Sequence, residues 1–411
     1  MRRYLLTIAA IATLLVACGG PPPQPATPPP GSVAPTPATP EAGPTAASTP
    51  AQPTPDVPTP VAQPLPAPLY VLELGQVARI ERDGTTRAVL TAEQSELQGV
   101  PPIAEFTVSP LGTLAYVVGD RAADRLVVAD ARGEGRRTLY EQSGHELSDL
   151  LFTPDGETLL FRLLNNREPP DLPSGLYRIP VLGGSPELLR ADDEVDDPVN
   201  PSRAISAYLP VALSPDGTSL LVNVRSLFYE DCTPGVMPAA GGEVARVQLP
   251  AGVAAYCGEA AWSAEGDAIL FLAGPADGPD AGPQLWRAGA DALAPTGLLP
   301  AGLYGRAPLG MPGGAIRLFL ARVERDATGA VTGGTFVLGE LPADGGEAIP
   351  LGVPFVERLE RALWAPDGSG AIVEVSSDTA ASLLRWMPAD GGEPLDLPST
   401  ESSVGGLAWG P

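Results

Sequence analysis

The side-chain inventory limits the chemistry that this chain could perform. It contains one histidine, His145, three cysteines and, among its 25 basic residues, no lysine. A Schiff base, a Ser-Lys dyad or a metal site made of several histidines therefore cannot be built. A Ser-His-Asp triad would have to use His145. No Gly-x-Ser-x-Gly elbow, phosphate loop or dinucleotide fingerprint occurs, so we predict no catalytic residue and no cofactor.

The densest charge cluster is an acidic run in the middle of the chain. Its carboxylates could bind Ca²⁺ through hard oxygen ligands. The spacing does not match the Asp-x-Asp-x-Asp-Gly loop, and charge runs are more often solvated, so we predict no metal site. The weak calcium candidates are Asp192, Asp193, Glu194, Asp196 and Asp197.

The charge balance excludes one class of partner. The net charge is −24, from 49 acidic and 25 basic residues. Binding to a nucleic-acid duplex needs the opposite sign, because the phosphates repel an acidic protein. We therefore expect no nucleic-acid partner and interpret the acidity as a source of solubility.

Cys18 ends a short apolar segment at the N-terminus. A basic start is followed by an apolar run over residues 5–15, which has the length of a signal-peptide core. Leu15-Val16-Ala17-Cys18 resembles the bacterial lipobox, in which the cysteine is acylated and becomes the mature N-terminus. The resemblance implies a signal peptide over residues 1–17 and a lipid anchor on Cys18. The alternative is an ordinary secretory peptide with an incidental cysteine.

A proline-rich segment follows. Of the 50 residues in 19–68, 19 are proline, and Glu41 and Asp56 are the only charges. Such a segment cannot form a core and is typical of a semi-rigid polyproline II tether, with a reach on the order of 150 Å. We expect the lipidated cysteine and Pro/Ala/Thr-rich tether over 18–68 and a folded domain over 69–411. A ligand for a proline-recognition domain is the alternative, and tether threonines could carry glycans.

The folded domain is organised around a repeated hairpin. In the clearest copy, Ser214-Pro215-Asp216-Gly217 stands between two apolar strands. Proline presets φ, aspartate bonds locally and glycine takes a positive φ, so the tetrapeptide predicts a tight turn. The other copies lie at 106–112, 151–156, 261–266, 308–315 and 363–368, with a truncated one at 407–411.

These hairpins divide the domain into units. A third strand and a second, Gly-rich turn follow each hairpin, so each unit has four short strands, and the units recur every 44 to 61 residues. Repeats of this kind predict an all-β propeller of four-stranded blades, seven by the count of hairpins, with six or eight as alternatives. Residues 69–90 lack an innermost strand, so we expect residues 404–409 to complete the first blade and close the ring.

The repeat resembles a known family. Ser-Pro-Asp-Gly followed by a turn such as Ala389-Asp390-Gly391-Gly392 is similar to the repeat of TolB-type propellers, which are related to WD-type repeats. The resemblance implies an extracytoplasmic protein-binding propeller. TolB has an extra N-terminal α/β domain and six blades, so its binding residues cannot be carried over. Gly144-His145 also resembles the Gly-His of WD repeats, which implies a structural role for His145 in preference to a catalytic one.

Strand order assigns the connections to two faces. Turns between strands 1 and 2 and between strands 3 and 4 share one face, where the short Gly turns lie. The opposite face, here called the long-loop face, should carry residues 165–174, 192–207, 226–235, 274–283 and 299–308. Binding sites concentrate on long loops of rigid scaffolds. Cys232 and Cys257 both fall on this face in neighbouring units, so we predict a disulfide, with two free thiols as the alternative.

The sequence therefore predicts a binding module more than an enzyme. We expect a monomer, lipid-anchored outside the cytoplasm at the cell surface or in the periplasm, that binds an envelope protein or a glycan. The residues predicted to anchor a partner are aromatic or arginine, some of which, Tyr256 foremost, would instead be core: Tyr208, Arg225, Phe228, Tyr229, Tyr256, Tyr304 and Arg306. The alternative is an envelope glycan hydrolase or lyase with two carboxylates at the central funnel.

Overall fold

A computed structural model describes eleven stretches of the chain: residues 64–95, 99–119, 123–167, 169–195, 204–226, 232–275, 282–300, 302–325, 331–377, 380–398 and 404–411. The chain divides into two compact units, residues 1–60 and 61–411, and all the described residues belong to the second. Every regular element in these stretches is a β-strand. None of them contains a helix that is long and apolar enough to span a bilayer.

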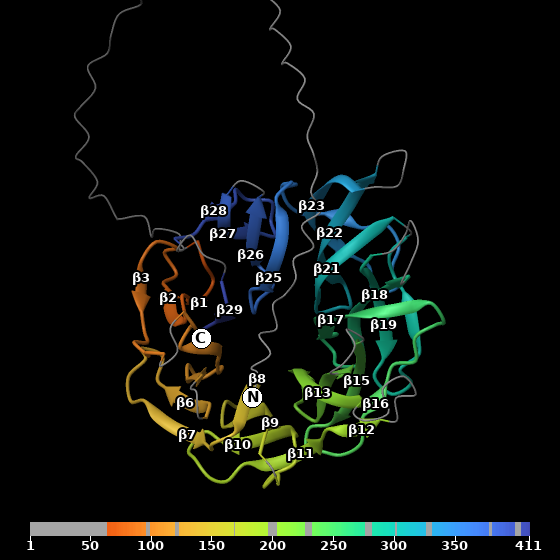
Figure 1. The fold of residues 1–411 in the computed structure, drawn as a ribbon. Coiled ribbons are helices and arrows are strands. Elements are labelled where there is room, and N and C mark those ends of the chain that lie inside the picture. Colours follow the sequence, from red (N-terminus) through yellow and green to blue (C-terminus); the bar gives the residue numbers. More distant parts are fainter. Residues whose placement is uncertain are drawn as a thin grey trace, which may run out of the picture. The chain divides into compact units, whose positions relative to one another are not determined.

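The strands form antiparallel sheets that follow one another in chain order (Figure 1). The first sheet contains β29 (Gly406–Trp409), β1 (Leu69–Glu73), β2 (Gln76–Ile80) and β3 (Arg87–Val89). The second contains β4 (Ile103–Val108), β5 (Leu114–Val118), β6 (Arg125–Ala129) and β7 (Arg137–Glu141), and the third β8 (His145–Phe152), β9 (Thr158–Asn165), β10 (Gly175–Pro180) and β11 (Glu187–Ala191).

The next sheet is larger, with β12 (Asp193–Val195), β13 (Ala204–Leu213), β14 (Ser219–Ser226), β15 (Cys232–Pro238), β16 (Ala245–Arg246), β17 (Val253–Trp262), β18 (Ala268–Pro275), β19 (Gln284–Gly289) and β20 (Pro295–Gly297). Two further sheets contain β21 (Leu303–Gly310), β22 (Ile316–Arg325), β23 (Val331–Leu341) and β24 (Ile349–Pro350), and β25 (Arg358–Trp364), β26 (Gly370–Ser377), β27 (Ala380–Pro388) and β28 (Leu395–Asp396). Strands thus extend into segments that the sequence predicted as long loops, since β12 and the start of β13 lie within 192–207.

The hairpin between β13 and β14 is stabilised by the hydrogen bonds and the positive φ that its turn sequence predicts. The backbone N–H of Ser214 donates to the carbonyl of Ser219 at 2.8 Å, and Gly217 has a φ of 70°. The Asp216 carboxylate accepts from the Ser214 hydroxyl at 2.6 Å and from the Thr218 N–H at 3.1 Å. These bonds lower the pKa of Asp216, the Ser214 hydroxyl most. Local side-chain bonds of this kind fix the hairpin independently of the rest of the sheet.

Both faces of each sheet are buried, which explains the nearly continuous apolar runs in the second strands. On β14, Leu220 and Val222 pack with the third sheet, whereas Leu221 packs with Phe271 of β18. The same alternation joins each sheet to the next in the chain. The apolar cluster of Leu69 also contains residues of β26 and β27, so the first sheet contacts the last one.

The first strand of most sheets is interrupted by a β-bulge. The register shifts in β4, β8, β13, β17, β21 and β25. In β8 the Glu105 carboxylate of the neighbouring sheet stabilises the bulge by accepting the N–H groups of Asp149 and Leu150, both at 2.7 Å. Asp149 has a φ of 56° there. Burial raises the pKa of Glu105. Glu259 does the same for Ala307 in β21, at 2.8 Å. Both carboxylates thus bind backbone amides.

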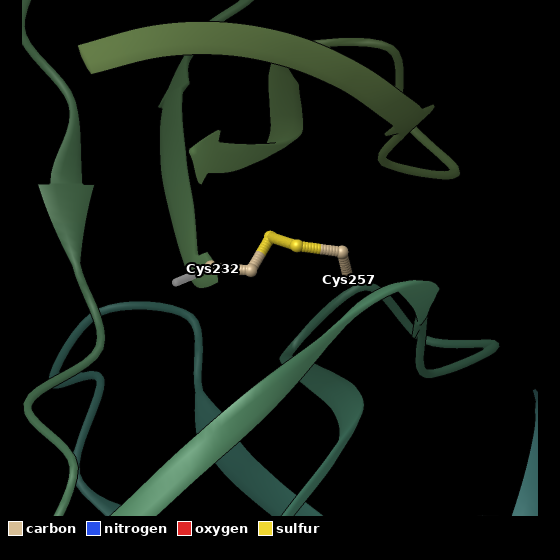
Figure 2. The surroundings of a disulfide bond; sticks show 2 residues. All are labelled: Cys232 and Cys257. Carbon is tan, nitrogen blue, oxygen red and sulfur yellow. A yellow bond between two sulfur atoms is a disulfide. The ribbon is translucent and has the colours of Figure 1, made fainter. Parts of the chain in front are cut away.

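The large sheet is continuous at one strand pairing, which lies beside a disulfide. Cys232 and Cys257 are bonded, with their Cα atoms 5.3 Å apart (Figure 2). The predicted disulfide is therefore present. Next to it, β15 pairs with β17 through Cys232 and Ala255, which joins the strands β12–β16 to the strands β17–β20.

Candidate binding site

A pocket lies beside the disulfide, where three bulged strands come together. It has a volume of about 360 Å³ and is lined by Asp149 of β8, by Leu209, Pro210 and Val211 of β13, by Asn223 and Arg225 of β14, and by Cys257 and Gly258 of β17. The bulge residues of β8 and β13 form part of its wall. Of the residues predicted to bind a partner, Arg225 lies in this pocket, and Tyr256 precedes the lining residue Cys257.

Tyr256 is exposed, contrary to the expectation that it would be the first of the candidates to be core. It is 40% exposed. The register of β17 breaks between Ala255 and Ala260, so Tyr256 stands outside the regular strand pairing. The exposed ring therefore stays a candidate contact for a partner.

Tyr208 and Tyr304 are buried instead, at 1% and 4% exposure. The Tyr208 hydroxyl donates to Asp193, and the Arg190 guanidinium lies 5.1 Å from the centre of the Tyr208 ring. The added Cβ of an alanine at Gly282 would meet the Tyr304 ring at 2.1 Å, which shows how closely the backbone covers it. These two rings cannot contact a partner without rearrangement, so their role in binding is corrected to a role in the core.

Arg306 is another predicted partner contact, and it is bound by other residues of the protein. Its guanidinium forms an ion pair with Glu259 and donates to the carbonyl of Leu359 at 3.4 Å. Phe228 and Tyr229 lie outside the described residues, as does Cys18. Arg225 and Tyr256 are thus the predicted anchors that the structure leaves open to solvent or to a ligand.

In the part of the acidic run that the structure describes, two aspartates form ion pairs with arginines. Asp193 accepts from Arg190 at 2.9 Å and from Tyr208. Burial opposes the ionisation of Asp193, but the bonds from Tyr208 and Arg190 outweigh it and lower the pKa. Asp192 is buried and accepts from Arg162 at 2.5 Å.

The calcium candidates are therefore placed as follows. Asp192 and Asp193 form ion pairs with arginines. The Glu194 backbone lies in β12. Asp196 and Asp197 lie outside the described residues. Among the described residues, no group of three or more histidine, cysteine, aspartate or glutamate side chains could hold a metal ion.

His145 is buried and bonded on both ring nitrogens. Nδ1 lies 2.6 Å from the Tyr140 hydroxyl and Nε2 lies 3.0 Å from Asp171. A neutral imidazole meets both partners if Nε2 donates to the carboxylate and Nδ1 accepts from the tyrosine. The bond from His145 contributes most to a lowered pKa of Asp171. His145 thus fastens the segment around Asp171 to β8, which is a structural role.

A larger hollow of about 520 Å³ lies on β21, β22 and β23. Its lining includes Leu303, Arg322 and Thr335. None of the residues predicted to bind a partner lines it, so the pocket beside the disulfide is the better candidate site.

Comparisons with known proteins show a shared fold. No protein-family model and no curated protein matches this chain. Similar solved structures include puromycin hydrolase, with a TM-score of 0.55 and 15% identity over 83% of this chain and 56% of that one. Oligogalacturonate lyase in complex with manganese has a TM-score of 0.52 and 13% identity, over 76% of this chain and 82% of that one. The fold is a β-propeller.

TolB from Acinetobacter baumannii is also among the matches, with a TM-score of 0.46 and 18% identity over 81% of this chain and 78% of that one. The chain spans only about half the length of puromycin hydrolase. At these identities the matches show the fold alone.

Proposed function

We propose that this protein is a lipid-anchored propeller outside the cytoplasm that binds an envelope protein or glycan through its long-loop face without catalysing a reaction. Its domain would have seven blades, because the large sheet divides into β13–β16 and β17–β20 and each remaining sheet supplies one more. The pairing of Leu69 with Trp409 supports closure of the ring by β29.

The proposed location outside the cytoplasm rests on the three cysteines of the chain. A disulfide between Cys232 and Cys257 suits an oxidising compartment, since reduced thiols prevail in the cytosol. The lipobox resemblance supplies the membrane anchor at Cys18, and the proline-rich segment over 18–68 supplies the distance from the lipid.

The observation that carries the binding role is the position of Arg225 and Tyr256. The side chain of Arg225 lines the pocket beside the disulfide, and the Tyr256 ring is exposed next to Cys257. Arginine and tyrosine are the residue types that contribute most to interface energies. Two acids next to the bulges, Glu105 and Glu259, bind backbone amides, which supports a structural role for these two carboxylates.

Crosslinking of the intact lipoprotein in its own membrane, followed by purification and mass spectrometry, tests the proposal. We expect one recurrent partner, whose yield falls when Arg225 and Tyr256 are both replaced by alanine. The matched controls are alanine replacements of Glu157, Glu347 and Glu393 beside the short turns, which should leave the yield unchanged. A partner lost only with the glutamate variants would place binding on the other face.

A further inference from the structure

Asn223 is a largely buried residue whose side-chain amide makes no hydrogen bond to the part of the chain that the structure describes. The residue is 5% exposed, and its side chain lines the pocket beside the disulfide. The fully buried, unpaired side-chain atoms of the described residues belong to other side chains, so the Asn223 amide remains accessible from the pocket and can bond to what the pocket holds. An amide that lines a pocket without a protein partner therefore suggests a ligand.

The repeat provides an internal comparison for this position. Counted from the first residue of each turn, Asn223 on β14 is equivalent to Arg162 on β9 and to Glu374 on β26. Arg162 donates to Asp192 at 2.5 Å, and Glu374 accepts the N–H of Val404 at 3.0 Å. Elsewhere the position is apolar, as at Leu272 of β18. At Arg162 and Glu374 the protein supplies at least one partner, although Arg162 Nε stays unpaired, whereas Asn223 has none among the described residues.

Two opposite charges line the same pocket. Arg225 forms no ion pair with any described residue, and the Asp149 carboxylate accepts only the neighbouring Ser148 hydroxyl, at 2.6 Å. No ion pair joins the two. A cation and an anion that face one cavity without meeting favour a ligand that carries both charges.

We propose that this pocket binds a small zwitterion, namely a free α-amino acid or a dipeptide. Its carboxylate would meet the Arg225 guanidinium, its ammonium group the Asp149 carboxylate, and its polar atoms the Asn223 amide, with Leu209 and Val211 as the apolar wall. A simple anion would be repelled by Asp149, and a neutral ligand would bury both charges without neutralising either. A volume of about 360 Å³ lies within the usual range of ligand pockets and suits a molecule of this size.

Titration calorimetry on the intact protein in detergent tests the inference, with alanyl-alanine as the probe. Two analogues each lack one charge: N-acetyl-alanyl-alanine has no ammonium group, and alanyl-alanine amide has no carboxylate. We expect the dipeptide to bind at least about tenfold more tightly than either analogue, because each loses a charge-assisted contact. Equal affinity for the dipeptide and an analogue, or no binding at millimolar concentration, would overturn the proposal.

Substitutions locate the binding. Arg225→Gln and Asn223→Leu should each weaken dipeptide binding about tenfold or more. Arg361→Gln on β25 removes the same charge from another sheet and should have no effect. Melting curves establish that each variant is folded, and the analogue series on the unaltered protein holds even if Asn223→Leu does not fold. Unchanged affinity in a folded Arg225→Gln variant contradicts the site.

The inference rests on the proposed function only in treating this pocket as part of the binding face. The two can fail separately. A recurrent envelope partner recovered by crosslinking, together with no dipeptide binding, would refute the zwitterion site and leave the binding module. Dipeptide binding without any envelope partner would do the reverse.

Discussion

Replacing Arg162 by leucine removes one half of a buried ion pair. The Arg162 and Asp192 side chains are 7% and 5% exposed, and their charged atoms lie 2.5 Å apart. The single change leaves the Asp192 carboxylate buried without its cation, which typically costs about 3–5 kcal/mol. For a domain of this size we expect the melting temperature to fall by roughly 4–7 °C.

The double variant Arg162→Leu/Asp192→Leu should recover most of that loss, because both charges are then gone. Leucine is compatible with the site, since Leu272 occupies the equivalent position on β18. Replacing a buried ion pair by apolar residues is often neutral or stabilising. The comparison of the single and the double variant by urea unfolding measures the coupling between the two side chains.

The pH dependence gives an independent check. Burial raises the pKa of Asp192 even with Arg162 in place, and the loss of the guanidinium would raise it further. A carboxyl whose pKa is higher in the folded state than in the unfolded state stabilises the fold at low pH and loses that contribution as the pH rises through the folded pKa. The Arg162→Leu variant should therefore be closer to the unaltered protein at pH 4.5 than at pH 8. A deficit that is independent of pH, or a double variant no more stable than the single one, would refute this account.

Three further outcomes follow from the anchor, the first sheet and the disulfide. Cys18→Ser should release the protein from the membrane fraction with an unchanged melting curve, and retention in the membrane would contradict the lipobox interpretation. Deletion of residues 404–411 removes β29 from the first sheet and should lower the melting temperature far more than deletion of eight tether residues, whereas equal effects would contradict ring closure. Cys232→Ser/Cys257→Ser should cost about 3 kcal/mol for a loop of 25 residues and speed hydrogen exchange in β15 and β17 selectively, so uniform exchange would contradict a local role.

The hairpins could be predicted from the sequence because their determinants are local. Proline, aspartate and glycine fix the turn by their own φ preferences and short-range bonds, as the contacts of Asp216 show. The disulfide followed from the same reasoning, since the strand order within each unit assigns Cys232 and Cys257 to one face. Strand spacing and turn chemistry thus determine most of the fold.

The candidate site could not be predicted in the same way, because it depends on register between strands. A bulge can shift side chains from one face to the other, and Tyr256, which was expected in the core, lies in such a register break and is exposed. Tyr208, which was expected at the surface, is buried in a regular part of β13. The partners of Asp192 and Asp193 come from other strands and have no local signature. Asn223 could have been singled out by aligning the repeat units, since a short amide stands where equivalent positions carry Arg162 or Leu272.

Five outer strands of the sheets are very short, and this restricts how copies of the protein can associate through them. β16, β24 and β28 each have two residues, and β3 and β20 have three. An outer strand of this length offers another chain only a few backbone hydrogen bonds, too few to nucleate an extended sheet between molecules. Copies of the protein are therefore not expected to join into a continuous sheet through these five strands, and contacts there would be made by side chains.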